Sequence, residues 1–573
     1  MKNMWTVLNN IVNKGTKGLE YPNNFQIQNT TTSDIKQIAN GFNDFVLDVG
    51  PGLAKEIVKT GHPPKTKTIN VANSMFMRGV DEKEIMDVVT SFNSKKSTDC
   101  DGIDMHLIKD IFGCIVKPFT YICNLSLQSG LFPDKMKIAK VVQIYKAGDK
   151  HLLTNYRPIS LLPQFSKILE QIFYNRLYDF IIKSNVLYEQ QYGFRPKRTT
   201  THALMEFIDT VTTAIENKKY AVGVFLDLKK AFDTVDHSLL LNKLCTYGVR
   251  GLALSWVNSY LTNRKQFTQI NAMESELKPV VCGVPQGSVL GPLLFILYIN
   301  EICAISKSLK IILFADDTNL LCCGSNLEQL LNELENELNN LKTWFDHNKL
   351  TLNLSKTKFI IFGNRTYSTN SKLTINNTEL DRVSEIKFLG VIIHHKLSWI
   401  PHITHIKGKI SKSLAILYKV KDLINQTSLY TLYCSIILLY MTYCVEVWGN
   451  TYKTHTYPIY ILQKRAIRII NKATSREPSN PLFIKLNILK FKDLVDLRTA
   501  QTMYKAANKS LPHNIQNLFQ IRPNTHDLRG ILMFSKSVVR TNVKYQSITV
   551  RGVSVWNTCT DEIKTSTSIQ KFT

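Results

Sequence analysis

The 573-residue sequence lacks the features that identify several common classes of protein. Its eleven cysteines form no CxxC pair and no zinc-knuckle spacing, so we expect reduced, mostly structural thiols. Met1–Asn13 has no charged start followed by a long apolar core, and therefore does not resemble a secretory signal. The most apolar stretch, Tyr430–Val445, is shorter than the roughly 20 residues that a bilayer requires, so we expect a buried helix and no membrane partner.

Acidic residues are scarce relative to basic ones, which indicates a polyanionic partner. The chain has 71 lysines and arginines against 45 aspartates and glutamates, a net charge of +26. Nucleic acid is the simplest such partner. An anionic membrane surface is the alternative, but the basic residues are spread along the chain. The length is sufficient for two or more domains with substantial cores.

The most informative segment is Phe314–Asp317, where two adjacent aspartates are flanked by apolar runs, Ile311–Phe314 and Leu320–Cys323. This pattern predicts two short strands with Asp316 and Asp317 at the turn between them. Adjacent carboxylates repel each other unless a cation lies beside them, and hard divalent metals prefer carboxylate oxygen. Taken alone, such a pair is more often a solvated turn, so the assignment depends on the rest of the chain.

A third carboxylate follows a second predicted strand. Tyr220–Asp227 is almost wholly apolar up to its final acid, which predicts a strand that is covered on both faces. Asp227 then lies where this strand ends and the chain turns towards a helix. Beside the hairpin it would complete a two-metal site, in which ions about 3.5–4 Å apart stabilise the attacking and leaving oxygens of phosphoryl transfer.

These segments are part of a series of motifs, in order over roughly residues 110–410, that resembles the reverse transcriptases of non-LTR retrotransposons, of the jockey-like and related LINE classes. The resemblance implies an α+β right-hand polymerase with fingers, a palm built on an antiparallel sheet, and a thumb, followed by a helix-rich C-terminal region. It places Asp227 in motif A, and Asp316 and Asp317 in motif C. It also implies that these aspartates hold two Mg²⁺ ions, or alternatively Mn²⁺.

Further motifs contain the residues that the resemblance assigns to the incoming nucleotide. Lys146 and Arg157, in a segment that resembles the fingers, would grip the triphosphate, where cations act as electrostatic catalysts. Phe232, five positions after Asp227, would lie under the sugar and exclude a 2′-hydroxyl, so that dNTPs are preferred. Taken alone, Lys146 or Arg157 could be a solvated surface cation, and Phe232 alone would be better explained as a core aromatic on an amphipathic turn.

Cys282–Pro292 resembles motif B, a turn rich in glycine and proline whose backbone can approach a ligand closely. By resemblance, Gln286 and Gly287 contact the template base and the nucleotide. Lys356, in the segment that resembles motif D, would protonate the departing pyrophosphate as a general acid. Arg195, in another fingers motif, would contact the template or the nucleic-acid backbone.

The patterns along the chain divide it into five parts. A leucine stripe over Leu327–Phe345 predicts a helix that lies under the palm sheet. The basic helix expected at Tyr460–Lys472 either contacts an RNA–DNA hybrid or faces solvent, and Ser535–Thr573 has short strand-like runs. We expect a linker region at residues 1–75, a helical N-terminal extension of the polymerase at 76–125, the reverse transcriptase domain with fingers and palm at 126–398, the thumb and connecting helices at 399–475, and a C-terminal region of unknown role at 476–573.

The expected function is that of an RNA-directed DNA polymerase, which extends a DNA primer 3′-hydroxyl on an element RNA template with dNTPs. In such elements this reaction is target-primed reverse transcription, with nuclear and cytoplasmic localisation, and no protein partner is predictable. One alternative is an inactive or co-opted nucleic-acid-binding remnant, against which the intact motifs argue. Another is an RNA-dependent RNA polymerase, against which Phe232 argues. Because no endonuclease or RNase H signature is visible, we expect the C-terminal portion of an element protein or a truncated copy.

Overall fold

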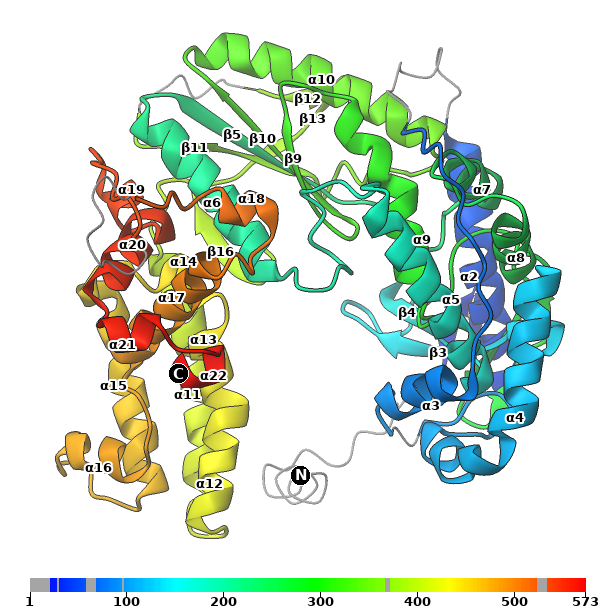
Figure 1. Ribbon diagram of the computed structural model, residues 1–573, viewed down its shortest axis with the longest axis horizontal. Helices are drawn as coiled ribbons and strands as arrows, with labels where there is room; N and C mark the ends of the chain where they lie inside the picture. The colour runs from blue at the N-terminus through cyan, green and yellow to red at the C-terminus, as the bar shows by residue number, and fades with distance from the viewer. Residues whose placement is uncertain are drawn as a thin grey trace.

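A computed structural model shows a mixture of helices and sheets, which confirms the predicted α+β class. In Figure 1 a central sheet lies at the top, between N-terminal elements on the right and C-terminal helices on the left. The structure describes residues 21–27, 30–57, 69–94, 97–365, 372–522 and 533–572.

The central sheet is built on a hairpin and a middle strand that the sequence predicts. Its strands, in spatial order, are β14 (Asp381–Arg382), β11 (Lys358–Phe362), β5 (Tyr220–Leu226), β10 (Asp317–Gly324) and β9 (Lys310–Phe314). β5 pairs antiparallel with both β10 and β11, and β9 pairs antiparallel with β10. The short edge strand β14 runs parallel to β11. This is the predominantly antiparallel sheet expected of a palm.

Both faces of β5 are covered, as its nearly continuous apolar sequence predicts. Val224 points into a core that it shares with α9 (Gly291–Ile299) and α10 (Leu327–His347). Phe225, the next residue, belongs to a second core, which it shares with α6 (Thr200–Glu216). α10 carries the leucine stripe and packs against β10, so the helix predicted beneath the sheet is confirmed.

A second sheet lies to the right of and below the central one in Figure 1. Its strands, in spatial order, are β4 (Tyr156–Leu161), β3 (Ile138–Tyr145), β6 (Lys265–Ile270) and β7 (Met273–Glu274), and β8 (Lys278–Pro279) also pairs with β6. β3 and β4 form an antiparallel hairpin, and β6 runs parallel to β3 on its other side. The connection between β3 and β4 therefore projects beyond the sheet.

The N-terminal helix α2 (Ile35–Glu56) packs on β6 and β7. Its N-cap is Asp34, whose side chain accepts a hydrogen bond from the backbone N–H of Lys36. Its apolar side, with Phe42, enters a small core that includes Phe25 of strand β1 (Phe25–Ile27). Within the region expected to be a linker, residues 35–56 are thus a helix packed against the second sheet.

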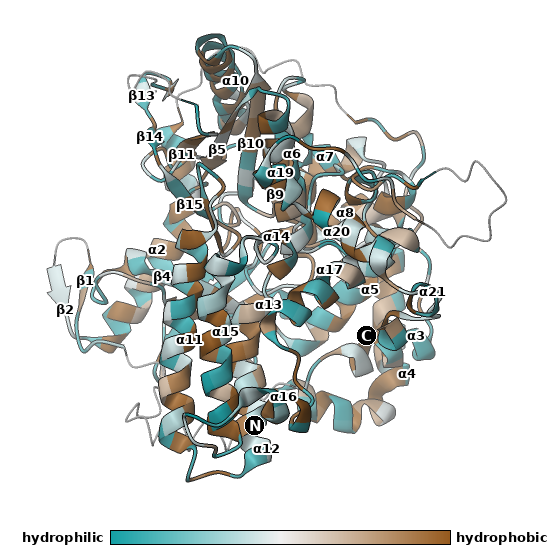
Figure 2. Cartoon of the chain, turned by 90° about the vertical axis from the view of Figure 1, so that its left-hand side faces the viewer, coloured by the Kyte–Doolittle hydropathy of each residue, from teal (hydrophilic) through white to brown (hydrophobic). Residues whose placement is uncertain are grey.

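The C-terminal part is helical, as predicted for the thumb and the region beyond it. α11 (Ile400–Val420) and α15 (Lys453–Ile470) lie side by side, and both mix hydrophilic and hydrophobic residues along their length (Figure 2). The helix expected over Tyr430–Val445 is present but broken, because a π-helical turn at Cys434–Leu438 follows α12 (Gln426–Tyr433). Among the described residues, no helix has the length and apolar character needed to cross a membrane.

The strand-like reading of Ser535–Thr573 is wrong. The described part of this segment is helical and contains α20 (Ile548–Thr558), which packs against α17 (Phe491–Ala507). Alternating β-branched residues suggested strands. However, Ile548, Val553 and Trp556 share one buried helix face, and this packing outweighs the weak intrinsic preference of such residues for strands.

Candidate active site

The Asp316–Asp317 hairpin forms as predicted. β9 ends at Phe314, β10 begins at Asp317, and these two residues pair across the turn. Ala315 adopts a positive φ of 59°, which allows the chain to reverse within two residues. Both aspartates therefore project from the end of the central sheet.

The neighbouring loop, which is the fingers motif that contains Arg195, supports this turn. The side-chain oxygen of the buried Gln191 accepts hydrogen bonds from the backbone N–H groups of Gly193 (2.8 Å) and Ala315 (3.1 Å). A Cβ atom at Gly193 would lie 2.2 Å from the backbone nitrogen of Ala315, so only glycine allows this approach. The loop Gln191–Arg195 thus fixes the hairpin from one side.

Asp227 lies directly after β5 and is held by the segment that resembles motif D. The Asn353 side chain donates a hydrogen bond of 2.8 Å to Asp227 Oδ2, and the Asn353 backbone N–H donates one of 2.7 Å to the Asp227 carbonyl oxygen. Such contacts orient a carboxylate for a ligand. The sequence indicates Asn353 only as part of the segment that resembles motif D. Nothing in its immediate neighbours shows that its side chain would contact Asp227.

The carboxylates influence one another's ionisation. Burial against the hairpin and the charge of Asp227 raise the pKa of Asp316, although Arg157 and Lys146 oppose the rise. Burial, followed by the charges of Asp316 and Asp227, raises the pKa of Asp317 to about 6. When these acids are ionised together, the neighbouring cations do not offset the repulsion between their negative charges. A bound divalent cation would reduce that repulsion.

These carboxylate oxygens therefore suit a hard divalent metal, but the protein side chains alone do not form a complete coordination site. Within the described ranges, no group of three or more His, Cys, Asp or Glu side chains is gathered so that it could hold an ion. Magnesium is often bound by one or two carboxylates together with waters and substrate phosphates. A complete coordination sphere would thus require substrate oxygens in addition to Asp227 and Asp316.

A cleft of about 1030 Å³ brings most of the predicted residues together. This volume is in the range of clefts that bind small-molecule substrates. Of the ten residues expected to be functional, eight line it: Lys146, Arg157, Asp227, Phe232, Gln286, Gly287, Asp316 and Lys356. These residues come from both sheets and from the loops after β5 and before α9, so the fold brings distant segments to one place.

Five cations line this cleft, and two of them, Lys229 and Lys230, were not predicted. Lys146 follows β3 and Arg157 lies on β4, so the β3–β4 hairpin presents both. The pKa of Lys230 is lowered by burial and then by the charges of Lys146, Arg157 and Lys356, while Asp233 opposes the change. Such a concentration of positive charge is suited to a polyphosphate.

Phe232 and the motif B loop form another wall of the cleft. The Phe232 ring stacks on Phe295 of α9 with centroids 4.4 Å apart, which holds it at the surface of the cleft. The backbone N–H of Val284 donates to the Phe232 carbonyl oxygen (2.9 Å) and joins the two loops. Gly287 has a φ of 131°, and a Cβ atom there would lie 2.4 Å from the Ser160 carbonyl oxygen. Glycine is therefore required for this loop to pack on β4.

Helix α2 closes the cleft on a further side. Phe45, Asp48 and Glu56 of this helix are among the lining residues, and the Lys230 ammonium lies 5.9 Å from the centre of the Phe45 ring. Gly50 allows the close approach, since a Cβ atom there would lie 2.4 Å from Cys282 Sγ. Nothing in the polar sequence before residue 75 identified this contribution.

Two predicted residues do not line the cleft. Asp317 lies beside Asp316 at the hairpin but is not among the lining residues. The Arg195 guanidinium donates a hydrogen bond of 2.7 Å to the Tyr188 carbonyl oxygen, and burial lowers its pKa. Arg195 is thus engaged by its own loop.

Known proteins resemble this chain over the segment that contains the cleft. Residues 144–393 match the family described as Reverse transcriptase (RNA-dependent DNA polymerase). The chain is 30% identical over 411 residues to the RNA-directed DNA polymerase from mobile element jockey of Drosophila melanogaster, covering 70% of this chain and 45% of that protein. It is 27% identical over 449 residues to the probable RNA-directed DNA polymerase from transposon BS of the same species, covering 75% and 48%.

The chain spans about half the length of the curated relatives that it matches. Among solved structures, a telomerase from Candida albicans in complex with a fragment of telomeric RNA is similar with a TM-score of 0.33 at 11% identity. That similarity covers 68% of this chain and 69% of the telomerase, and is too low to assign a fold.

Proposed function

Residues 144–393 form a reverse transcriptase domain of the jockey-like, non-LTR type, and from this premise we propose that the chain is an RNA-directed DNA polymerase. It would extend a DNA 3′-hydroxyl on an RNA template. The observation that carries the proposal is the shared cleft, which Asp227 and Asp316 line together with five lysine and arginine side chains. Carboxylates and cations arranged in this way suit a metal-bound polyphosphate.

In the proposed reaction, the primer 3′-hydroxyl attacks the α-phosphate of a dNTP and pyrophosphate leaves. Asp227, Asp316 and Asp317, together with substrate oxygens, would hold two divalent cations, Mg²⁺ or Mn²⁺, which would supply Lewis-acid activation and charge neutralisation. Lys146 and Arg157 bind the triphosphate from the tip of the β3–β4 hairpin. Lys356 gives a proton to the departing pyrophosphate. Catalysis is then mainly positioning and charge stabilisation.

The other cleft residues would select the substrate. Phe232 lies under the sugar and excludes a 2′-hydroxyl, and its stacking on Phe295 supports this role by holding the ring in place. Gln286 and Gly287 contact the nucleotide and the templating base. Arg195 contacts the template only after it leaves the Tyr188 carbonyl oxygen, so we assign it the least direct part.

The biological setting is proposed from the relatives. The template would be the RNA of the element, the primer a nicked chromosomal DNA end, and the sites of action the nucleus and cytoplasm. The proposed divisions are fingers and palm at residues 126–398 and a thumb with connecting helices at 399–475, with a linker and helical extension before them and a further region after them. The net charge of +26 supports binding to both nucleic acids.

The test is Mg²⁺-dependent extension of a DNA primer on an RNA template. We expect labelled dNTP incorporation by the wild type and its loss in the Asp316→Ala/Asp317→Ala variant. A matched control is Asp87→Ala, which removes an exposed acid from α3 (Glu82–Ser91). No incorporation by a folded wild type that still binds the primer–template would contradict the proposal and favour a nucleic-acid-binding remnant.

A further inference from the structure

A pocket of about 380 Å³ lies at the opposite end of the central sheet from the aspartates of the main cleft. Gly363, which lines it, follows Phe362, and Phe362 pairs with Ala221 near the start of β5. Asp227 follows the last residue of the same strand. At about 3.3 Å per residue, β5 separates the two places by about 20 Å. The pocket is therefore distinct from the main cleft, and the proposed reaction does not use it.

Basic side chains from four segments of the chain meet in this pocket, which we call the rear pocket. They are Lys218 in the turn after α6, Arg365 after β11, Lys396 after β16 (Val391–His394) and Arg540 before α19 (Asn542–Tyr545). All four residues are exposed, and none of the described residues that line the pocket is acidic. In the described part of the chain, Lys218, Arg365 and Lys396 form no ion pair with an acid. Their like charges repel one another, so a bound anion would stabilise the arrangement.

Helix α6 fixes the C-terminal wall of the rear pocket. The Arg540 guanidinium donates hydrogen bonds of 2.9 Å to the Ile215 carbonyl oxygen and 3.0 Å to that of Glu216, at the end of the helix where carbonyl groups lack helical partners. The Glu216 carboxylate accepts a hydrogen bond of 2.9 Å from the Thr541 backbone N–H. This acid is thus engaged by the wall and does not line the pocket. α19, which follows, packs against α6 to the left of the central sheet in Figure 1.

The opposite wall offers a guanidinium beside open backbone. The Arg365 guanidinium lies 5.0 Å from the centre of the Tyr220 ring, a contact that holds it at the rim. Gly363 has a φ of 123°, and a Cβ atom there would have no neighbour within 4 Å. A ligand can therefore approach the chain closely at this point. A guanidinium presents paired N–H donors that match two oxygens of one phosphate.

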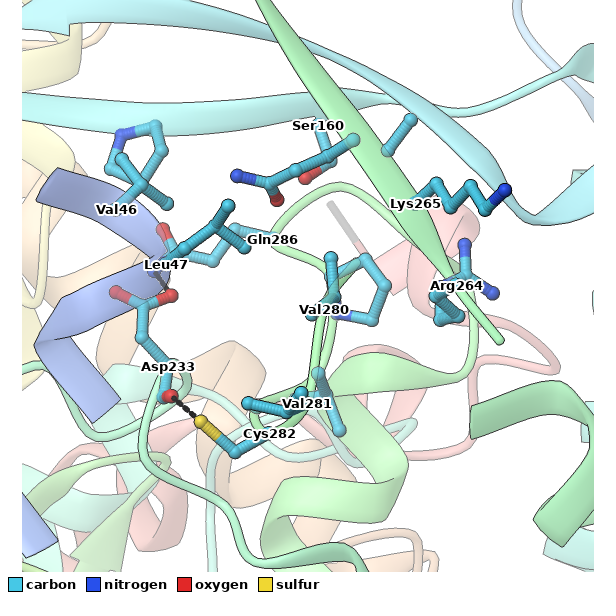
Figure 3. Close-up of a pocket in the computed structure, with 16 residues that line it drawn as sticks. Val46, Leu47, Ser160, Asp233, Arg264, Lys265, Val280, Val281, Cys282 and Gln286 are labelled. Atoms are coloured by element: carbon cyan, nitrogen blue, oxygen red, sulfur yellow. Dashed lines mark hydrogen bonds between the residues drawn. The ribbon is translucent and has the colours of Figure 1, made fainter. Parts of the chain in front are cut away.

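The small cavity behind the main cleft differs from the rear pocket in its charge. Figure 3 shows Asp233 and Gln286 among its lining residues, together with apolar side chains such as Leu47 and Val280. Gln286 Nε2 donates a hydrogen bond of 2.8 Å to Asp233 Oδ1. A phosphate in that cavity would meet a carboxylate and apolar surface. Of the two, only the rear pocket suits an anion.

We propose that the rear pocket binds a phosphate in the backbone of a nucleic-acid strand that lies outside the main cleft. The net charge of +26 suits a polyanion, and exposed lysines and arginines bind its phosphates by releasing counterions. At about 3.4 Å per nucleotide, a strand that leaves the cleft covers the separation of about 20 Å in roughly six nucleotides or more. The inference goes beyond the proposed polymerase reaction, because it concerns binding at a separate place.

The test measures binding of the full chain to a short primer–template duplex, with and without a single-stranded RNA tail of about 20 nucleotides, which is long enough to reach the rear pocket. We expect the tail to strengthen binding by the wild type. Lys218→Asn/Lys396→Gln removes two cations of the pocket and should reduce the contribution of the tail by roughly three- to tenfold. The slope of log affinity against log salt should fall by about 1.4, for two lost phosphate contacts. Asparagine is chosen at position 218 because it tolerates the φ of 57° found there.

A matched control loses the same charge elsewhere. Lys117→Gln/Lys183→Gln removes two exposed lysines, one from α4 (Met105–Ser129) and one from the last turn of α5 (Gln164–Lys183). It should keep the full contribution of the tail. Melting curves show that each variant folds, and the single variant Lys396→Gln carries the test if the double variant does not. A DNA tail of the same sequence identifies the strand: an equal loss indicates the shared phosphate backbone, and a loss with the RNA tail alone indicates RNA.

Three results would overturn the inference: an unchanged contribution of the tail in folded Lys218→Asn/Lys396→Gln, an equal loss in the control variant, or a wild type that gains nothing from either tail. A wild type that binds the tail but incorporates no dNTP would instead overturn the proposed function and leave the rear pocket in place.

Discussion

Replacing Asp317 with asparagine should stabilise the metal-free protein and reduce its stabilisation by Mg²⁺. Asp317 lies beside Asp316, and every influence on its ionisation acts in one direction. Burial makes the largest contribution to the pKa of Asp317, and the negative charges of Asp316 and Asp227 add to it, so that this pKa rises to about 6. At neutral pH the ionised carboxylate therefore costs folding free energy, which a neutral amide does not.

The sign and size of the effect follow from that pKa. The ordinary value for aspartate is about 4, so the folded protein holds the proton more tightly than the unfolded chain. Stability that is present below about pH 4 is lost as the pH rises to about 6, and stays lost above it. Two pKa units would be worth about 3 kcal/mol for a fully buried group. Although the surrounding hairpin partly desolvates Asp317, its side chain is still in contact with solvent, and solvent screening reduces the expected gain to about 1 kcal/mol.

The assay is thermal unfolding of wild type and Asp317→Asn, with a chelator and with saturating Mg²⁺. A gain of about 1 kcal/mol corresponds to about 1 °C in a chain of this size. The gain should be present at neutral pH, disappear near pH 4, and shrink or reverse with Mg²⁺. Asp87→Asn, which neutralises an exposed acid of α3, should show none of this dependence. A lower melting temperature for metal-free Asp317→Asn at neutral pH, or an equal gain near pH 4, would refute the electrostatic reasoning.

Three other predictions concern the cleft. Phe232→Ala should raise incorporation of ribonucleotides relative to dNTPs by about tenfold or more in competition assays, as expected for loss of a steric barrier, and an unchanged ratio would remove its assignment as the sugar gate. Gly50→Ala should destabilise the protein by about 1–3 kcal/mol in unfolding experiments, because its Cβ atom would lie 2.4 Å from the nearest sulfur. Gly52→Ala, whose Cβ atom has no neighbour within 4 Å, is its control on the same helix and should not destabilise. Asn353→Ala should lower kcat by about tenfold or more and raise the Mg²⁺ concentration needed, because it frees the Asp227 carboxylate; normal activity would show that this contact has no catalytic value.

The expected elements of the central sheet could be read from the sequence because each has a strong local signal. The acid pair between two apolar runs predicts a hairpin, and the apolar run before Asp227 predicts a strand that is buried on both faces. The leucine stripe after residue 327 predicts an amphipathic helix. The prediction was wrong at Ser535–Thr573. Short strand-like runs suggested strands there, but this segment contains a helix that packs on α17.

The residues that support the site were harder to find. Gln191 and Asn353 act through hydrogen bonds to residues 124 and 126 positions away. Both residues lie in segments that resemble polymerase motifs, but no local pattern indicates that their side chains support the carboxylates. Lys230 was not predicted as a cleft residue either, because a lysine after a buried strand usually faces solvent.

The sequence by itself determined the class of fold, the hairpin that carries Asp316 and Asp317, and the basic character of the protein. These properties depend on the pattern of apolar and polar residues, on turn-forming residues and on charge, all of which can be recognised within short segments. Only the tertiary structure decided that α2 closes the cleft, that five cations line it, and that Gln286 donates a hydrogen bond to Asp233. Those features depend on contacts between segments far apart in the chain, and it is the packing of both sheets with α2 that brings them within hydrogen-bonding and electrostatic range.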